Sequence, residues 1–446
     1  MSVLFKDPST TEFLQQEHSA MGLDFDRFLN WIQEPPDCST FRVNSLKYSK
    51  EEAQGIIEKS LDEVADQNGF TGRPAVQSCS LVDDVFIIGS WNRVPNFVEK
   101  PTGEKISKAD EEVVVDASCG AAILRGAHLF APGVLSMSRG MEVGQKVSVF
   151  ADLDGKCLQG STSYQGRKKL VGKGLVELAR DALFNDSSDR AKGVAVRIKW
   201  TPQGILTFNF PSALGQLQNL PSSAASWELN PRPGDSVLDM CASPGNKTSH
   251  LAALMQNEGT LIAIDRTEKK CDLVRQTCEK FGAKSLVFCY DSTKACQDNV
   301  ERVIEEGPPF SQNSFDKILL DAPCSALGQR PQLLNKISAG QIKSNPLLQK
   351  RLFRTAVNLL KPGGELVYCT CSTTFDENEG LINWAMQEFQ NILVLQSPRK
   401  RVTQVIPLKN VPEEIYSKVQ RFGPPTDNAE ECSDSIGFFI SRFKKV

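Results

Sequence analysis

The chain has 446 residues, which is enough for two or three domains with at least one large buried core. Hydrophobic residues make up 40% and charged residues 24%, as in soluble globular proteins, so disordered and collagen-like chains are excluded. The net charge of −3 does not by itself indicate a nucleic-acid partner. No apolar run approaches the ~20 residues that a membrane span needs, so we expect no membrane partner.

The use of cysteine and histidine narrows the chemistry. Thirteen cysteines are scattered along the chain without a Cys-x-x-Cys pair, and there are only three histidines. This pattern argues against a disulfide framework, a structural zinc site and a Cys–His protease, so we expect no metal. The first twenty residues lack the basic-then-apolar run of a signal peptide, and we therefore expect a cytoplasmic protein.

Residues 1–109 are expected to form an N-terminal segment of helical or mixed character. A helix is predicted over 12–31, followed by a strand over 40–44 and a second helix over 49–69.

Residues 110–203 are predicted to be mostly β. Short apolar runs at 113–115, 121–124 and 146–150 are separated by glycines and a Pro-Gly turn. Residues 111–200 contain 13 Lys and Arg against 10 Asp and Glu, a local net charge of +3 that leaves −6 for the rest of the chain. The pattern indicates a small β domain that is mildly basic.

Residues 204–446 show the alternation of a doubly wound α/β domain. Their apolar runs are hydrophobic on both faces and are separated by helical patterns, as strands buried between two helix layers require. The predicted strands are 236–240, 260–265, 286–289, 315–321, 365–370 and 437–443. The polar segment 396–433 is expected to be a long loop.

In such a sheet, ligands bind beyond the carboxyl ends of the strands. The first predicted strand is followed by a Pro-Gly turn that lacks the glycine spacing of dinucleotide and P-loop motifs. Asp265, about twenty residues further on, suits a carboxylate that binds ribose hydroxyls, although it could instead only cap the next helix. A ribosylated ligand without phosphates is therefore expected, and S-adenosylmethionine fits that description.

Two cysteines follow neighbouring strands of the predicted sheet. Cys324 stands in an Asp-Ala-Pro-Cys loop after the strand at 315–321, and Cys371 follows the next strand. Cytosine C5 accepts a methyl group only after a thiolate has added to C6, so this chemistry needs a nucleophilic cysteine, a carboxyl group at the base edge and a group for release. Asp321 and the two thiols supply that set. The other cysteines are expected to be small buried hydrophobes.

The α/β part of the chain contains the motifs DMCASPGNKTSH, DAPCSALG, YCTCSTTFDENE and DSIGFF, and the runs FRVN and QNLPS lie upstream of them. Together these motifs resemble the Sun-domain RNA cytosine-5 methyltransferases. The resemblance implies a Rossmann-like, seven-stranded class I methyltransferase domain that uses S-adenosylmethionine. It also implies that Cys371 is the nucleophile, that Cys324 assists its release, and that Lys247 lies near the donor or the target base. A lysine on the helix surface is the alternative for Lys247. The implied catalytic residues are Cys371, Cys324, Asp321 and Lys247. The expected donor-binding residues are Cys241, Ala242, Ser243, Pro244, Gly245, Asn246, Lys247, Asp265, Lys270, Asp291 and Asp321.

Three positions depart from the pattern of that family. Ser243 and Asn246 stand where Ala and Gly are common, and we expect the loop to keep its shape because Asn tolerates left-handed backbone. Cys369 stands where Ser is common. We expect it to point to the opposite face of its strand from Cys371, so that only Cys371 faces the cleft.

The segment CGAAILRGAHLFAPGVLSMSRGMEVGQKVSVFADLDGKCLQG resembles a PUA domain, a small β-barrel that binds structured RNA. With this domain between FRVN and the methyltransferase motifs, the chain resembles the member-six branch of the family. That branch implies transfer RNA as partner, a target cytosine near the 3′ end of the acceptor stem, and a PUA domain on the CCA end. The expected phosphate contacts are Arg125, Lys156, Arg167, Lys168 and Lys169; a solvated loop is the alternative for the last three.

Two alternative functions stay open. The same chemistry could act on messenger or ribosomal RNA, which only the PUA domain argues against. A catalytically inactive RNA-binding scaffold is opposed by the presence of Cys324, Cys371 and Asp321 together. We expect the chain to act as a monomer.

Overall fold

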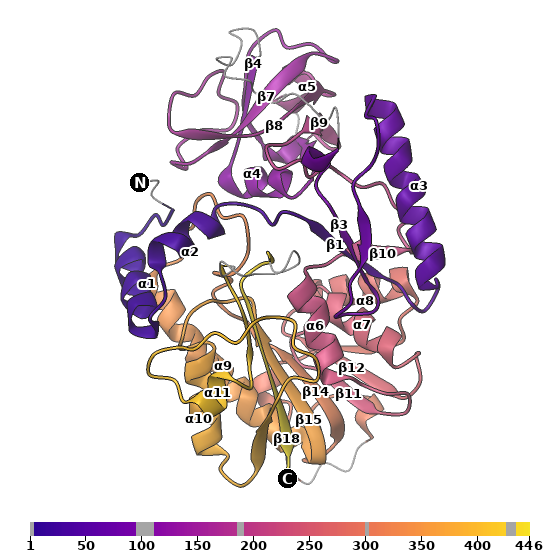
Figure 1. Ribbon diagram of the computed structural model, residues 1–446, viewed down its shortest axis with the longest axis vertical. Coiled ribbons are helices and arrows are strands. Elements are labelled where there is room, and N and C mark those ends of the chain that lie inside the picture. The colour runs from indigo at the N-terminus through magenta and orange to yellow at the C-terminus, as the bar shows by residue number, and fades with distance from the viewer. Residues whose placement is uncertain (1–3, 95–110, 185–190, 299–302, 425–433) are drawn as a thin grey trace.

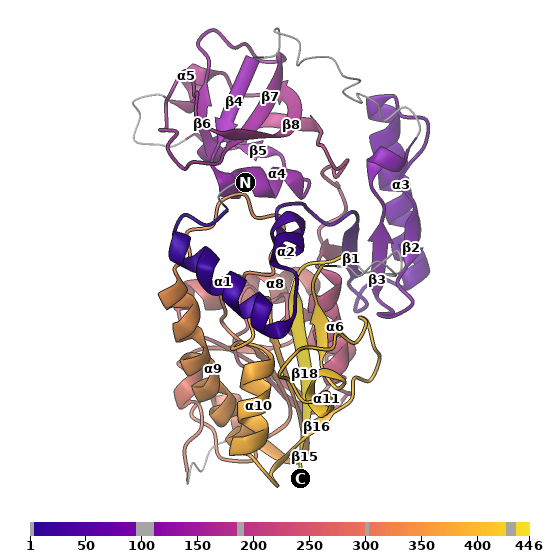
Figure 2. The same cartoon turned by 60° about the vertical axis from the view of Figure 1, so that its left-hand side comes forward.

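The computed structural model describes residues 4–94, 111–184, 191–298, 303–424 and 434–446. A β domain lies at one end of the long axis and a large mixed sheet covered by helices lies at the other (Figure 1). The N-terminal helices and a small sheet lie beside the junction of these two parts, as the turned view also shows (Figure 2). Within the described residues, no helix combines the length and the hydropathy needed to cross a membrane.

The first helix predicted in the N-terminal part is replaced by two helices in the structure. The stretch 12–31 is divided between α1 (Pro8–Met21) and α2 (Phe25–Ile32), because Gly22 takes a φ of +76° and its amide caps α1. The predicted strand and second helix are present as β1 (Ser39–Val43) and α3 (Lys50–Asn68).

The small N-terminal sheet draws one strand from far along the chain. Its order is β10-β1-β3-β2, with β2 at Val76–Ser78, β3 at Val85–Ile88 and β10 at Gly215–Leu217. β10 pairs antiparallel with β1, so this segment belongs to the N-terminal sheet although it lies beyond the predicted boundary at 204. The other predicted boundary, at 109–110, falls outside the described residues.

The β domain is built on six strands in the order β5-β9-β8-β7-β4-β6. They are β4 (Glu111–Val115), β5 (Leu129–Phe130), β6 (Val134–Met137), β7 (Lys146–Asp152), β8 (Lys168–Val176) and β9 (Val194–Trp200). Two helices accompany them, α4 (Ala117–Leu124) and α5 (Arg180–Leu183). The run 121–124, predicted within a mostly β region, is thus helical rather than extended. Small residues let α4 pack closely, because a Cβ at Gly120 would lie 2.4 Å from that of Ala151.

The large sheet has the strand order β13-β12-β11-β14-β15-β18-β16, and an eighth short strand, β17, pairs with β18. The strands are β11 (Ser236–Asp239), β12 (Thr260–Asp265), β13 (Leu286–Cys289), β14 (Phe315–Asp321), β15 (Leu360–Thr370), β16 (Leu393–Gln396), β17 (Gln420–Phe422) and β18 (Phe438–Lys445). β11 to β15 are parallel and β18 is antiparallel to β15. This is the expected Rossmann-like sheet, except that β17 lies in the segment predicted to be a loop.

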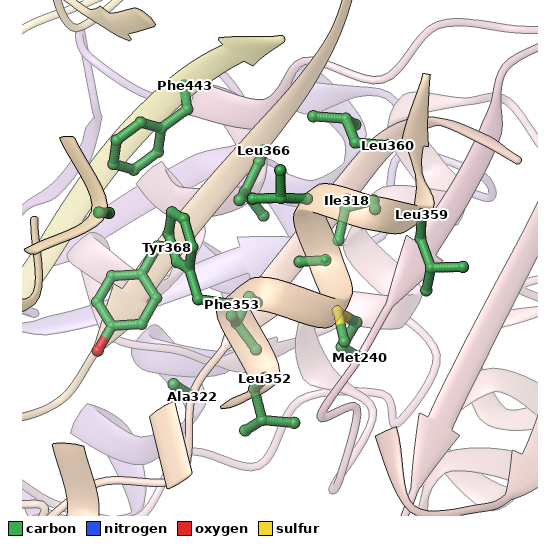
Figure 3. Close-up of a cluster of buried hydrophobic side chains, with 14 of the residues drawn as sticks. Met240, Ile318, Ala322, Leu352, Phe353, Leu359, Leu360, Leu366, Tyr368 and Phe443 are labelled. Carbon is green, nitrogen blue, oxygen red and sulfur yellow. The ribbon is translucent and has the colours of Figure 1, made fainter. Parts of the chain in front are cut away.

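Six α-helices accompany the large sheet in the part of the chain that the structure describes. They are α6 (Leu220–Leu229), α7 (Asn246–Leu254), α8 (Glu268–Phe281), α9 (Ala339–Leu359), α10 (Glu379–Glu388) and α11 (Glu413–Tyr416). The main core lies between the sheet and α9 and α10 (Figure 3). There the ring of Phe353 packs edge-on against Tyr368 and Phe443, with centroids 6.0 and 5.3 Å apart. The Tyr368 hydroxyl leaves this core to donate to the carbonyl of Glu377, 2.6 Å away. The core thereby anchors the loop that follows β15.

Two glycines allow three segments to meet beside that loop. The amide of Gly328 donates to the carbonyl of Cys371 at 2.8 Å, and the amide of Gly437 donates to the carbonyl of Gly328 at 2.8 Å. A Cβ at Gly328 would lie 1.9 Å from the carbonyl oxygen of Gly437. No rotamer change can relieve a clash with backbone, so any side chain at Gly328 must move the loop after β14.

We expect Gly328→Ala to lower the free energy of unfolding by about 3 kcal/mol, the upper part of the usual range for overpacking. Gly55→Ala is the matched control, since Gly55 is exposed in α3 and its Cβ would meet nothing within 4 Å. That control should gain about 0.5–1 kcal/mol from helix propensity. Urea titration of both variants tests the contrast, and equal midpoints would contradict the close approach.

Candidate active site

The two predicted thiols meet at the carboxyl ends of neighbouring strands. Cys324 follows β14 and Cys371 follows β15, and their sulfur atoms lie 3.4 Å apart in a hydrogen bond. This hydrogen bond lowers the pKa of Cys371 below that of an ordinary thiol, although burial opposes the change. The same bond, together with burial, raises the pKa of Cys324. Of the two thiols, Cys371 is therefore the one that gives up its proton more readily, and the thiolate is the nucleophilic form.

A lysine and a carboxylate lie next to the thiols. The Lys247 Nζ atom lies 2.6 Å from an Asp321 carboxylate oxygen. Burial by itself lowers the pKa of Lys247, but Asp321 and the neighbouring thiols outweigh it and hold the pKa above its ordinary value. Lys247 thus stays charged at the site, and the alternative of a lysine on the helix surface is excluded because only 11% of its side chain is exposed.

The prediction for Cys369 was wrong. Its sulfur lies 3.4 Å from the second oxygen of Asp321, so Cys369 and Cys371 both reach the same group of side chains. Residues two apart on a strand point to the same face, because the side-chain period of a strand is two. Cys369 is fully buried beneath the site, whereas Cys371 is partly exposed.

A cavity of about 640 Å³ opens above these groups, between the methyltransferase sheet, the N-terminal part and the β domain. Its lining includes Cys371, Lys247 and Asp321 on one side and Arg125 on the other. Cys324 does not line the cavity, although its sulfur lies next to that of Cys371. An incoming group would therefore meet the Cys371 sulfur.

The loop after β11 keeps its shape for a reason that we did not predict. The left-handed residue is Gly245, with a φ of +101°, and Asn246 is simply the first residue of α7. Asn246 therefore needs no tolerance of left-handed backbone. A Cβ at Gly245 would lie 3.0 Å from the Cα of Val274 in α8, so the loop also packs tightly against its neighbour.

Sequence reasoning missed Arg42, which holds this loop from the N-terminal sheet. Its guanidinium donates to Ser249 Oγ at 2.9 Å and to the carbonyl of Asn246 at 3.3 Å, and only 2% of the residue is exposed. Burial lowers the pKa of Arg42 to about 10. The signal was present in the FRVN run, where an arginine interrupts a buried strand.

The remaining donor-binding candidates gather around Asp265. Its carboxylate accepts from the amides of Ser243 at 3.0 Å and Arg266 at 2.7 Å, and Lys270 Nζ lies 3.2 Å away. A carboxylate has about four acceptor positions, so capacity for ribose hydroxyls remains. Asp291 lies after the next strand and is occupied by its own turn, where Thr293 donates to it and lowers its pKa.

The other loop candidates are placed by backbone contacts. The amide of Ala242 donates to the carbonyl of Ile264, and the carbonyl of Pro244 accepts from Thr277 Oγ1 at 2.7 Å. Burial raises the pKa of the Cys241 thiol well above its usual range. A loop of this kind between β11 and α7, beside the carboxylate that ends β12, fits an adenosyl group.

Two of the expected phosphate contacts are engaged within the protein. Lys168 forms an ion pair with Glu112, and Lys169 Nζ lies 2.7 Å from a carboxylate oxygen of Glu34. Lys169 therefore joins the β domain to the segment after α2.

The other basic residues differ in their availability. Arg125 lines the cavity, and Lys156 is exposed in the turn after β7. Arg167 lies 2.7 Å from Asp154 across an exposed loop, where such pairs contribute little to stability.

Comparisons with known proteins agree with this geometry. The family described as 16S rRNA methyltransferase RsmB/F matches residues 226–444, and the PUA domain family matches residues 111–199. The chain is 37% identical to the tRNA (cytosine(72)-C(5))-methyltransferases NSUN6 of Mus musculus and Homo sapiens. Each alignment covers 94% of this chain, with 90% of the mouse and 91% of the human protein.

A solved structure shares the fold over nearly the whole chain. The crystal structure of NSun6 from Pyrococcus horikoshii with SFG superposes with a TM-score of 0.72 at 24% identity, covering 99% of both chains. At that identity the likeness establishes the fold. The identity and coverage of the mouse and human relatives go further: the chain belongs to the RsmB/F family of Sun-domain RNA cytosine-5 methyltransferases, and it carries a PUA domain.

Proposed function

We propose that this enzyme transfers a methyl group from S-adenosylmethionine to C5 of a cytosine in transfer RNA, at position 72 of the acceptor stem. The observation that carries the proposal is the pair of thiols, 3.4 Å apart, of which Cys371 lines a cavity that the β domain also lines. The position is the one named for the relatives from mouse, human and Pyrococcus horikoshii.

The geometry supports covalent catalysis by Cys371. Its thiolate adds to C6 of the cytosine, and the electrons of the C5–C6 double bond make C5 nucleophilic. Asp321 and Lys247 lie beside it and can meet the N3/N4 edge of the base as charge develops there. After methylation, a base removes the C5 proton, the double bond forms again and the C6–S bond breaks.

S-adenosylmethionine supplies the methyl group when it is bound. Asp265 would accept from the ribose hydroxyls, and the loop 241–245 would face the methionine part of the donor. Arg42 keeps that loop in place through Ser249 and the carbonyl of Asn246. Asp291, two strands from the loop, would meet the adenine side.

The β domain supports a structured RNA substrate. Arg125 faces the cavity from this domain and Lys156 is exposed on it, so these two can reach phosphates. Lys168 and Lys169 would first have to leave their glutamates, which makes them secondary contacts. Because one chain supplies the thiols, the donor loop and the β domain, we propose that the enzyme acts as a monomer.

The test is transfer of tritiated methyl groups to transfer RNA. We expect label in an unmodified transcript with a terminal G–C pair, and none when that pair is changed to A–U so that cytosine 72 is absent. A transcript that lacks the 3′ CCA end should be methylated poorly. Label confined to ribosomal or messenger RNA would overturn the substrate, and donor binding without any RNA label would favour an inactive scaffold.

A further inference from the structure

A fully buried glutamate lies directly beneath the two thiol loops. Glu377 is 0% exposed and belongs to the segment after β15, ahead of α10. Its backbone is fixed from two sides. The Tyr368 hydroxyl donates to its carbonyl, and the neighbouring Asn378 side chain accepts from Thr370 at 2.6 Å and donates to the carbonyl of Ser372 at 3.1 Å. The oxygen of Tyr368 is seen leaving the aromatic core in Figure 3.

One carboxylate oxygen of Glu377 accepts from three N–H groups. They are the amide of Ser325 at 2.9 Å, Asn345 Nδ2 at 2.9 Å and Gln349 Nε2 at 3.1 Å. Gln349 also donates to the carbonyl of Pro323 at 2.9 Å, so Gln349 and Glu377 together hold the residues on both sides of Cys324.

The other oxygen accepts from three hydroxyl groups. They belong to Ser325, at 2.5 Å, Thr374, at 2.9 Å, and Ser372. Ser325 follows Cys324 and Ser372 follows Cys371, and their hydroxyls also lie 2.9 Å from each other. A single carboxylate thus ties together the loops that carry the two thiols.

All of these donors are neutral. They stabilise the negative charge of Glu377 without neutralising it, so neighbouring groups still experience that charge. Burying a carboxylate is costly, and a satisfied hydrogen-bond frame offsets that cost without a partner cation. A negative charge in a low-dielectric interior disfavours a second negative charge nearby. Glu377 accepts from both the amide and the hydroxyl of Ser325, next to Cys324, but only from the hydroxyl of Ser372, next to Cys371. Its charge accordingly contributes to the raised pKa of Cys324.

We propose that Glu377 is a positioning residue with two effects: it sets the spacing of the two thiols, and its charge keeps the shared proton on Cys324 so that Cys371 is the nucleophile. The proposal rests on the two-thiol reaction proposed above. It also explains why two chemically identical side chains in one cleft take different roles.

The two sets of donors make it possible to separate charge from geometry. In Glu377→Gln the amide oxygen can face the three N–H groups, while its NH₂ group donates to two of the three hydroxyls, which can also accept. This variant removes the charge and keeps the frame. Glu377→Asp keeps the charge but moves the carboxylate about one methylene away from its hydrogen-bond donors, which weakens those hydrogen bonds.

The readout is limited alkylation with iodoacetamide, in which a thiolate sulfur bonds to carbon and iodide leaves. Mass spectrometry gives the ratio of modified Cys371 to modified Cys324 in the full chain. We expect Cys371 to dominate in the wild type, and the ratio to fall about tenfold in Glu377→Gln, as one pKa unit of relative shift requires. Glu377→Asp should keep the ratio near the wild-type value while methyl transfer slows.

Glu228→Gln is the matched control, because Glu228 is also a buried glutamate, but its oxygens contact Arg399 and Arg442 instead of the thiol loops. Its alkylation ratio should stay unchanged. An unchanged ratio in Glu377→Gln, or an equal fall in Glu377→Asp, would overturn the proposal. The alkylation experiment needs no RNA. A wild-type protein that methylates nothing would therefore refute the proposed function, while the alkylation ratio would still test the role of Glu377.

Discussion

Cys371→Ala is expected to lose methyl transfer by about 10⁵-fold or more, the scale seen when an enzyme loses its nucleophile. Without a thiolate at C6, cytosine C5 does not become nucleophilic enough to attack the methyl group. Cys324 is not expected to replace it, since Cys371 lines the cavity and Cys324 does not. Tritium incorporation into transfer RNA measures the loss.

Binding should survive this substitution. Among the residues that the structure describes, Asp265 hydrogen-bonds to the donor loop and the Cys371 sulfur to Cys324, so calorimetry should give the same affinity for S-adenosylmethionine as in the wild type. Cys296→Ala is the matched control, because Cys296 is a partly buried thiol of the same domain that does not line the cavity. It should retain full activity. If Cys371→Ala still methylates and Cys324→Ala is inactive, the nucleophile is Cys324 and the two assignments must be reversed.

The residues of the site could be predicted because the topology of a parallel sheet gathers them. Asp321 ends β14, Cys324 and Cys371 follow β14 and β15, and Lys247 lies in the first turn of α7, the helix after β11. β14 lies between β11 and β15, so these strand ends meet at one edge of the sheet. The strand boundaries alone therefore suffice to predict that these side chains lie close together.

Contacts between distant segments were beyond that reasoning. Lys168 and Lys169 form a basic run, and nothing local shows that Glu112 and Glu34 neutralise them. β10 joins the N-terminal sheet because it pairs with β1, and such pairing is a property of the folded chain.

Glu377 was overlooked for a different reason. In the sequence it stands in the acidic run DENE, which is typical of a solvated turn, whereas the structure buries it completely. A buried carboxylate without a cation is recognised only by its donors, and these come from three separate segments: the loop after β14, the loop after β15, and α9. The error about Cys369, by contrast, was avoidable, since the period of a strand already places it on the face of Cys371.

Cys324→Ala is expected to trap the enzyme on its RNA. The Cys324 sulfur lies 3.4 Å from that of Cys371, which places it within reach of the methylated base once Cys371 is bonded to C6. Elimination requires that the C5 proton pass to a base, that its electrons restore the C5–C6 double bond, and that the Cys371 sulfur leave. Removing the base should slow release by about 10²–10⁴-fold, the usual contribution of a positioned general base. A covalent protein–RNA adduct should then appear on a denaturing gel.

The state of Cys324 changes during the reaction in the direction that release needs. Before addition, the hydrogen bond to the Cys371 thiolate is the largest cause of the raised pKa of Cys324. Once the Cys371 sulfur is bonded to C6 it carries no negative charge, so that cause disappears and Cys324 gives up its proton more readily. To act as the base, Cys324 then passes its own proton to solvent, and its thiolate takes up the C5 proton. The double variant Cys324→Ala/Cys371→Ala should form no adduct, and normal turnover by Cys324→Ala would assign the proton removal to another group.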